Sequence, residues 1–482
     1  MYGGEASLRR VREAVKDDDA HGKVRQAHAA IEAGDHATGL RLCNEVLDTN
    51  VDHPEALYLA AAALYKSGRS GLAYNLFRRS CQLQPDRAEP WNMAGTCLEK
   101  VWMIEAAERC FKEALKKNPQ NHAALQNMSL ICLNKCEPDE ALKWVARAEK
   151  CGVTSWENLD NKAMALLMKR DWSGWEPYRQ TAGKTKPRQL RAYNDPEEPM
   201  WSGEKGSVVV YGNQGIGDEI AFASCVPDAC EVADIIIDCD HRVAPLFKRS
   251  FPKAKVYGTR HKDDRDWDHA IDYSIPVDCL PGLFRKKDSD FPGTPYLKAD
   301  PERRVQWRAL FDTFTKPVIG VAWTGGGDHT GRKKRSLTLE DLLPVFRSID
   351  ATWVSLEYRN VTQELEEFEM EHGIKIRDFP RATRSGEFAD YDDTAALVAE
   401  LDLVISVTTA VIHLAGALGQ SCWVLAPHKA RWYYGMEGNL PWYRSVTMFR
   451  QSRDGIWPLE ELIRRLGLRH GALDLQRFAH SG

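Results

Sequence analysis

Three turns in the second half of the chain carry residue types from which an anion-binding or group-transfer site could be built. The first reads Gly215-Ile216-Gly217-Asp218-Glu219, where glycines admit a ligand close to the backbone and a helix start offers N–H donors to an anion. Asp218 falls in the first turn of that helix, where the helix dipole stabilises its charge. We take Asp218 as a candidate proton acceptor and Gly217 as a candidate binding residue; an ordinary first-turn acid is the alternative.

The second turn runs from Trp323 to Ser336 and combines a glycine-rich loop with four consecutive cations. Thr324 and Gly325 open the loop, and Arg335 is the last of the cations. Guanidinium and ammonium groups neutralise phosphate oxygens, so this composition suits a diphosphate. A solvated basic loop is the alternative.

The third turn opens at Ser406 and continues through Thr408, Thr409 and Ala410 to His413. Hydroxyl groups and free backbone N–H groups at a helix N-terminus again suit a phosphate. Ordinary helix caps explain Thr408 or Thr409 as well, and a histidine one turn into a helix is often a structural residue. Each turn alone is a weak signal, and the combination of the three is a stronger one.

The elements that must position these turns form an alternating strand and helix pattern, which predicts parallel sheets. Continuous apolar runs predict strands within 207–212, 233–240, 253–258, 316–326, 351–357, 374–379, 393–407 and 421–427, the last of them SCWVLAP. Helices are expected at 242–251, 339–349 and 362–373. The pattern predicts two adjacent α/β lobes, 207–305 and 316–466, with ligands bound at the carboxyl ends of the strands in the cleft between the lobes.

The first part of the chain repeats itself every 34 residues, over about residues 21–180. Small or bulky side chains recur at matching places in successive rows: Ala61, Gly95 and Ser129; Ala73, Ala107 and Ala141; Phe77, Phe111 and Val145. Small residues let paired helices approach closely, and the bulky residue fills the space between repeats. This pattern resembles the tetratricopeptide repeat, which implies a helical solenoid whose concave face binds extended peptides or partner proteins. An array that merely dimerises or supports the following lobes is the alternative.

Composition excludes several classes of function. Lysine and arginine number 65 against 69 aspartates and glutamates, and the net charge of −4 disfavours a protein that tracks nucleic acid. The N-terminus does not resemble a secretory signal, and no apolar run is long enough to span a membrane. The 12 cysteines form no CxxC pair, which disfavours a zinc or redox framework. We expect buried reduced thiols and a cytoplasmic protein.

The α/β part also resembles a known family, through the run DDTAALVAELDLVISVTTAVIHLAGALGQSCWVL and the turn GNQGIGDEIAFASCVP. These segments look like the glycosyltransferase family 9-like proteins, which include the ADP-heptose heptosyltransferases. The resemblance covers about residues 205–466. It implies a GT-B fold of two Rossmann-like lobes, a nucleotide sugar as donor substrate on the C-terminal lobe, and no required metal or cofactor.

The resemblance also implies a role for single residues. Asp218 matches the family's proposed general base, and Arg335 matches a basic residue on the donor phosphates. Thr324 and Gly325 fall near those phosphates, and Glu357 ends a strand whose tip lies near the nucleoside. The donor-binding helix start is matched by Thr409, Ala410 and His413. Thr408 departs from the family, because an aspartate is common at this position. The loss of that carboxylate implies either a changed donor or a weak or inactive relative.

The sequence therefore predicts an α plus α/β protein: a tetratricopeptide-repeat array (1–180), a polar linker (181–206), an acceptor-side lobe (207–305), a donor-side lobe (316–466) and a tail (467–482). The expected function is metal-independent, inverting transfer of a sugar to a hydroxyl acceptor, with a protein presented by the repeats as the expected acceptor. The alternative is a non-catalytic interaction scaffold with a degenerate transferase module. A nicotinamide oxidoreductase is disfavoured, because both lobes lack the glycine spacing and ribose-binding acid that the cofactor requires.

Overall fold

The computed structural model describes residues 19–185, 188, 190–194, 196–262, 269–315, 317–326, 332–379 and 390–480. The chain divides into two compact units, Met1–Ala165 and Leu166–Gly482, called here the repeat unit and the α/β unit. Among the described residues, no helix is long and apolar enough to cross a membrane. All 12 cysteines are free thiols, and most are buried, as the sequence predicts.

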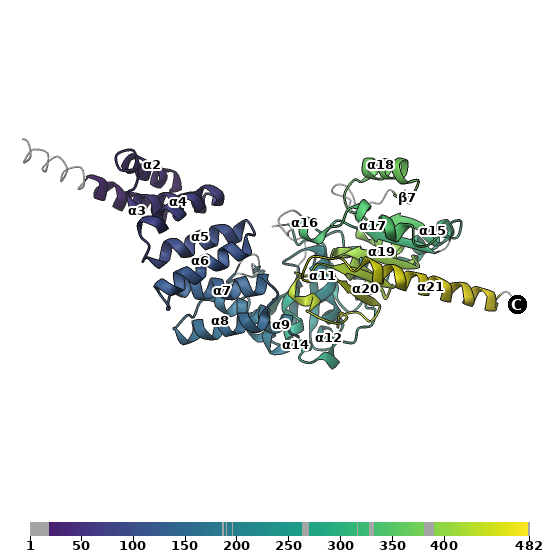
Figure 1. Ribbon diagram of the computed structural model, residues 1–482. Helices are drawn as coiled ribbons and strands as arrows, with labels where there is room; N and C mark the ends of the chain where they lie inside the picture. The colour runs from purple at the N-terminus through teal and green to yellow at the C-terminus, as the bar shows by residue number, and fades with distance from the viewer. Residues whose placement is uncertain are drawn as a thin grey trace, which may run out of the picture. The chain divides into compact units, whose positions relative to one another are not determined.

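The repeat unit consists of successive antiparallel helices (Figure 1). A first helix covers residues 19–32. It is followed by α2 (His36–Leu47), α3 (Pro54–Lys66), α4 (Ser70–Leu83), α5 (Ala88–Lys100), α6 (Ile104–Lys117), α7 (His122–Asn134), α8 (Pro138–Lys150) and α9 (Trp156–Met168), which continues into the α/β unit. The pairing of neighbouring helices confirms the predicted tetratricopeptide-repeat solenoid.

The 34-residue period is visible in the backbone itself. The turn between the two helices of each repeat places one residue in the left-handed region, with φ of 87° at Gly34, 79° at Gly68, 62° at Trp102, 57° at Cys136 and 60° at Arg170. Each of these residues follows the previous one by one repeat length. The same turn is therefore built five times, first with glycine and then with larger residues.

The repeated small and bulky residues pack as the sequence predicts. Ala73, Ala107 and Ala141 are completely buried. A Cβ atom added to Gly95 would lie 2.6 Å from the ring of Phe111, which is itself buried. Small residues in one helix therefore leave the space that the bulky residue of the next helix fills.

The α/β unit begins with α10 (Trp175–Gln180) and contains a first sheet of four parallel strands in the order β3-β2-β1-β4. The strands are β1 (Ser207–Tyr211), β2 (Asp234–Asp238), β3 (Lys255–Tyr257) and β4 (Tyr273–Pro276). The helices that accompany them are α11 (Ile216–Phe222), α12 (Val226–Ala229), α13 (Ala244–Ser250) and α14 (Pro281–Phe284). Strand β1 is buried along most of its length, as expected of an apolar inner strand of a parallel sheet.

The second sheet has six parallel strands in the order β10-β9-β8-β5-β6-β7. The strands are β5 (Val318–Ala322), β6 (Thr352–Ser355), β7 (Ile376–Arg377), β8 (Leu403–Val407), β9 (Cys422–Ala426) and β10 (Val446–Arg450). The helices are α15 (Pro301–Phe311), α16 (Arg332–Arg335), α17 (Leu339–Phe346), α18 (Thr362–His372), α19 (Tyr391–Ala399), α20 (Ala410–Leu418) and α21 (Leu459–His480). Numbered within this sheet, the order is 3-2-1-4-5-6, the doubly wound order of nucleotide-binding folds.

These sheets confirm the predicted α/β class, with one correction to the strands. The prediction that SCWVLAP forms the last strand is wrong, because β10 follows it and pairs with β9 in parallel. Strand β10 escaped prediction because polar and apolar residues are mixed in VTMFR, so it lacks the continuous apolar run of the inner strands. Strand β4 was not predicted either, since it is short and ends in proline.

The polar stretch 181–206, read from its composition as a linker, packs against the first sheet in its described residues. Trp201 is fully buried and its backbone N–H donates to Ser274 O at 2.9 Å. Arg188 is also buried, and its Nε donates to Asp278 Oδ2 at 3.1 Å. The predicted domain boundaries stay a prediction.

Candidate functional site

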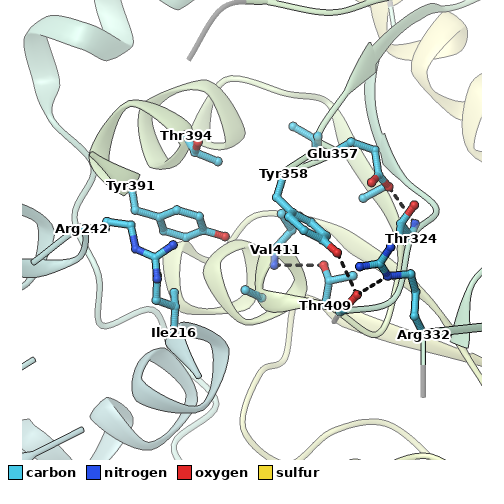
Figure 2. A pocket seen from close by; sticks show the side chains of 14 residues that line it. Ile216, Arg242, Thr324, Arg332, Glu357, Tyr358, Tyr391, Thr394, Thr409 and Val411 are labelled. Atoms are coloured by element: carbon cyan, nitrogen blue, oxygen red, sulfur yellow. Dashed lines mark hydrogen bonds between the residues drawn. The ribbon is translucent and has the colours of Figure 1, made fainter. Parts of the chain in front are cut away.

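A pocket of about 410 Å³ lies at the carboxyl ends of β5, β6 and β8, where the order of the second sheet reverses direction. In such sheets the connections on the two sides of this point leave in opposite directions, which opens a crevice for a ligand. Figure 2 shows Arg242 and Tyr391 on one side of the pocket and Arg332 on the opposite side. The lining residues are Ile216, Arg242, Ala322, Thr324, Gly326, Arg332, Leu356, Glu357, Tyr358, Tyr391, Thr394, Thr409, Ala410 and Val411.

Glu357 lies just after β6 and forms hydrogen bonds with the loop that follows β5. Its Oε1 accepts hydrogen bonds from the backbone N–H groups of Trp323 at 2.8 Å and Thr324 at 2.7 Å. Burial raises the pKa of the Glu357 carboxyl above its usual value. Thr324 in turn accepts a hydrogen bond at Oγ1 from Arg359 Nε at 3.0 Å. The predicted site residues Thr324 and Glu357 therefore lie together in the pocket wall.

Gly325 and Arg335 lie side by side just behind this wall. A Cβ atom on Gly325 would lie 2.6 Å from Arg335 Cβ and 2.7 Å from its carbonyl oxygen, so only glycine fits. The Arg335 guanidinium donates to Gly325 O at 3.1 Å and to Thr408 O at 3.4 Å. Burial lowers the pKa of Arg335 below its usual value. Arg335 thus joins the loops that follow β5 and β8.

The start of α20 forms another side of the pocket. The Thr409 hydroxyl caps the helix by accepting from Val411 N–H at 3.3 Å, and Ala410 follows in the lining. Thr408, just before the cap, is buried, and its hydroxyl has no hydrogen-bond partner within the described part of the chain. The N-terminal N–H groups of a nine-residue helix therefore lie at the pocket, as the sequence predicts.

His413 lies outside the pocket lining, one turn further into α20. Its Nδ1 lies 3.2 Å from the Tyr443 hydroxyl and its Nε2 lies 3.0 Å from the Tyr434 hydroxyl. Burial lowers the pKa of His413 from 6.5 to about 4, so the ring is neutral at pH 7. This geometry is that of a hydrogen-bonded structural histidine, the alternative that the sequence left open.

Asp218 is buried at the start of α11 and also lies outside the pocket lining. Its Oδ1 accepts from Arg431 Nη1 at 2.6 Å and from the Tyr433 hydroxyl at 3.0 Å. Its Oδ2 accepts from the Gly215 backbone N–H at 3.2 Å. Both carboxylate oxygens are therefore engaged by groups of the protein.

Gly217 brings the two lobes into contact. A Cβ atom there would lie 3.1 Å from Ala410 Cα and 3.4 Å from His413 Cδ2, so the absence of a side chain lets α11 approach the start of α20 closely. The three predicted turns are thus brought together, since Gly217 and Ala410 belong to the first and third turns and Arg335 bridges the second and third. The Gly327–Gly331 part of the second turn lies outside the described residues.

Several pocket residues were not predicted, chiefly arginine and tyrosine side chains. Arg242 reaches the pocket from the first sheet and is held by Asp240, with Nε and Nη2 each 2.9 Å from a carboxylate oxygen. Arg332 belonged to the predicted basic run, but only Arg335 was selected from it. Tyr358 donates to Gly326 O at 2.8 Å, and Arg332 Nε donates to the same oxygen at 3.1 Å. The sequence signal that could have identified Tyr358 as a pocket residue is its position directly after the predicted strand 351–357.

The described residues bring possible metal ligands together at one place, the exposed Glu340 and Glu371 with the half-buried His372. His372 Nε2 lies 2.9 Å from both carboxylate oxygens of Glu340. None of the three lines the pocket. This surface group therefore has no part in the site described above.

The tetratricopeptide repeat family model matches residues 24–88. Protein FlbA of Caulobacter vibrioides is 28% identical to this chain over 438 residues, covering 84% of this chain and 71% of that protein. Because the repeat unit holds only residues 1–165, this similarity extends well into the α/β unit. The name of that relative states no activity.

Several solved structures that the chain resembles, tetratricopeptide-repeat proteins among them, cover about a third of it. MamA of Desulfovibrio magneticus RS-1 covers 31% of this chain and 92% of its own, with 16% identity and a TM-score of 0.27. PilF of Pseudomonas aeruginosa covers 35% and 79%, with 15% identity and a TM-score of 0.33. A thermophilic repeat protein of Thermus thermophilus covers 36% and 93%, with 19% identity and a TM-score of 0.31.

Proposed function

We propose that this chain is a glycosyltransferase of the GT-B type, similar to family 9, that moves a sugar from a nucleotide-sugar donor to a protein hydroxyl. The observation that carries the proposal is the pocket at the carboxyl ends of β5, β6 and β8. It combines a helix N-terminus with the guanidinium groups of Arg242 and Arg332, the donors that phosphate oxygens need. The apolar and aromatic lining from Leu356, Tyr358 and Tyr391 suits a nucleoside.

The proposed reaction breaks the O–H bond of the acceptor as its oxygen attacks the anomeric carbon of the donor. The proton passes to Asp218, and the bond between sugar and nucleotide breaks with its electron pair leaving on the phosphate. Cations and helix N–H groups stabilise that developing negative charge. Oδ1 of Asp218 already accepts two hydrogen bonds and Oδ2 accepts one, so the acceptor hydroxyl binds at Oδ2 or replaces Arg431, which is more exposed than Tyr433.

The experiment that tests this proposal compares donor hydrolysis and sugar transfer by the full chain and by Asp218→Asn. We expect Asp218→Asn to keep donor binding within about twofold and to lower turnover by about 10²- to 10⁴-fold, the range attributed to general base catalysis. Glu231→Gln is the control, because Glu231 is an exposed surface acid on Lys253. Equal turnover by Asp218→Asn and the control would remove Asp218 from the reaction.

The protein acceptor rests on the repeat unit, since tetratricopeptide repeats indicate peptide or protein partners. Deleting residues 1–165 should abolish transfer to a protein acceptor while donor hydrolysis persists, which would also show that the α/β unit remains folded. Unchanged transfer by the shortened chain would exclude presentation of the acceptor by the repeats.

A non-catalytic scaffold is the second candidate, and the engagement of Asp218 favours it. An aspartate with both oxygens bound, together with Thr408 where the similar family has a carboxylate, is also what a degenerate module would show. A scaffold predicts no donor hydrolysis and no effect of Asp218→Asn beyond stability. Measurable hydrolysis that depends on Asp218 excludes this candidate.

A further inference from the structure

The repeat unit carries an open groove of about 900 Å³ on the turns of its second and third repeats, between α3–α4 and α5–α6. Its lining includes the apolar side chains of Leu72 and Val101 and the cationic side chains of Lys66, Arg69 and Lys100. None of its lining residues lines the pocket of the α/β unit, and the chemical step proposed above uses none of them.

Large apolar side chains are concentrated beside this groove. Leu72 is 56% exposed, Val101 51%, Trp102 47% and Met103 53%. Single exposed apolar residues are common on soluble proteins, but four of this size on two neighbouring turns form a patch. Such patches mark surfaces that bind other molecules.

Two residues of these turns, Trp102 and Arg69, are expected to lower the stability of the fold. Trp102 has a φ of 62° at the position where the earlier repeats use Gly34 and Gly68. A bulky residue in this left-handed conformation is strained, whereas glycine is not. The backbone of this turn would therefore be more stable with glycine, as it would be at Cys136 and Arg170 of the following repeats. Trp102 differs from Cys136 in that its large apolar side chain is exposed.

The next position along the turn shows the same conflict. Asp35 and Asp171 cap the helical segments that follow them by accepting backbone N–H bonds from Thr38 and Ser173. The equivalent residues before α4 and α6 are Arg69 and Met103, and neither makes a side-chain cap bond. A cation at a helix N-terminus also opposes the helix dipole. The second repeat thus lacks the cap bond, and the third lacks both the cap bond and the glycine; Glu137 of the fourth repeat makes no cap bond either, but it is an acid and so suits the helix dipole.

The charge of the groove indicates the chemistry of its occupant. Lys66, Arg69 and Lys100 are all exposed and line the groove, and none of them takes part in an ion pair within the described part of the chain. Lys66 and Lys100 lie in the last turns of α3 and α5, where they also favour the helix dipole. Arg69 lies before the N-terminus of α4, where a cation does not favour the helix dipole, so binding of a negatively charged partner better explains its presence.

We propose that this groove is a docking site for an acidic, apolar segment of a partner protein, with Trp102 and Leu72 binding its apolar side chains and Arg69, Lys66 and Lys100 its carboxylates. A hollow surface suits an extended or helical segment better than a flat lipid headgroup layer. The inference goes beyond the proposed function and does not require it, because docking is measured without any donor.

The test uses the full chain and a fluorescein-labelled twelve-residue peptide in which acidic residues alternate with leucine and phenylalanine. Two matched probes carry lysine in place of the acids, or serine in place of the apolar residues. Fluorescence anisotropy should show binding of the acidic apolar peptide at least tenfold tighter than of either matched probe. Added salt should weaken that binding, because the cations are exposed.

The decisive variants are Trp102→Gly and Arg69→Asp, which restore the glycine and the acidic cap used by other repeats. Each should weaken the acidic apolar peptide at least tenfold while the urea midpoint of unfolding stays the same or rises. Glu137→Asp is the matched control, since it changes the cap position of α8 in the next repeat and lies outside the groove lining. It should leave peptide binding within twofold.

Two results would overturn the inference. One is binding that is unaffected by Trp102→Gly and Arg69→Asp, or that does not discriminate among the three probes. The other is no peptide binding together with binding of phosphatidylglycerol vesicles that these two variants abolish, which would make the patch a lipid surface. A negative result for peptide docking at the groove does not affect the proposed donor pocket, because donor binding is assayed separately.

Discussion

The Asp218 carboxylate and the Arg431 guanidinium form an ion pair of 2.6 Å although the two residues are 213 positions apart. Asp218 belongs to the helix after the first strand of the first sheet, and Arg431 follows β9 of the second. Tyr433 donates to the same carboxylate oxygen at 3.0 Å. The ion pair therefore joins the two lobes of the α/β unit at the residue proposed as the general base.

The pairing of Asp218 with Arg431 should be measurable as a coupling free energy. Removing one partner of a hydrogen-bonded buried charge typically costs about 1–3 kcal/mol. In a double-mutant cycle of Asp218→Asn and Arg431→Gln, urea unfolding should give a coupling of about 1–2 kcal/mol. Additivity within about 0.3 kcal/mol would mean that the contact contributes nothing to the stability of the folded chain.

Gly325 should not tolerate a side chain. In Gly325→Ala the new Cβ atom would meet Arg335 Cβ and its carbonyl at 2.6 and 2.7 Å, and relieving such overlap typically costs about 1–3 kcal/mol. Gly467→Ala is the matched control, since Gly467 lies in α21 with no atom near the added Cβ, and it should stabilise by about 0.5–1 kcal/mol. Equal effects of the two substitutions on urea unfolding would refute the close approach.

His413 should make stability depend on pH in a defined direction. Burial lowers the pKa of its ring from 6.5 to about 4 in the folded protein. The unfolded chain therefore takes up the proton first, and stability that is present above pH 6.5 is lost as the pH falls toward 4. The loss is about 3 kcal/mol for this group.

The contribution of His413 is isolated by subtracting the stability of His413→Gln from that of the unchanged chain at each pH. The difference should favour the unchanged chain near pH 7 and shrink steadily as the pH falls toward 4. A difference that stays constant over this interval would show that His413 is not buried in its neutral form.

Asp278 should hold the first turn in place. It is completely buried and accepts hydrogen bonds from Asn213 at 3.1 Å, Gln214 at 2.8 Å, Tyr178 at 2.9 Å and Arg188 at 3.1 Å. Asp278→Ala leaves the buried Arg188 without this partner, and such a loss typically costs about 3–5 kcal/mol.

The exposed Asp86, which pairs with Lys117 at 3.4 Å, gives the matched control. Asp86→Ala should change the free energy of unfolding by less than about 0.5 kcal/mol, since surface pairs contribute little. The two variants are compared by urea unfolding, and similar losses from both would contradict the anchoring role of Asp278.

The sequence predicts the fold better than the site, for physical reasons. Periodic packing residues such as Ala107 and Phe111 have a local signature, because every repeat must solve the same packing problem. Apolar runs likewise mark the inner strands, while the edge strand β10 lacks one. The residue types of the turns located Thr324 and Thr409, and the family resemblance added Glu357; all three line the pocket.

The remaining parts of the site depend on contacts between distant segments. Arg242 enters the pocket only because the first sheet packs beside the second, and Arg431 reaches Asp218 across 213 positions. His413 looks the same in sequence whether it faces a ligand or two tyrosines, and only its burial decides between them. Local pattern carries no information on such distant pairings.

The measurement that tests the central claim most directly is calorimetric binding of ADP-, GDP-, UDP-, CMP- and dTDP-linked sugars to the full chain. The account predicts that one nucleotide class binds with micromolar affinity, that Arg332→Ala and Arg335→Ala weaken it at least tenfold, and that Asp218→Asn leaves it within about twofold. If none of the donors binds under conditions in which the chain is folded, the result would contradict a nucleotide-sugar pocket and favour the scaffold.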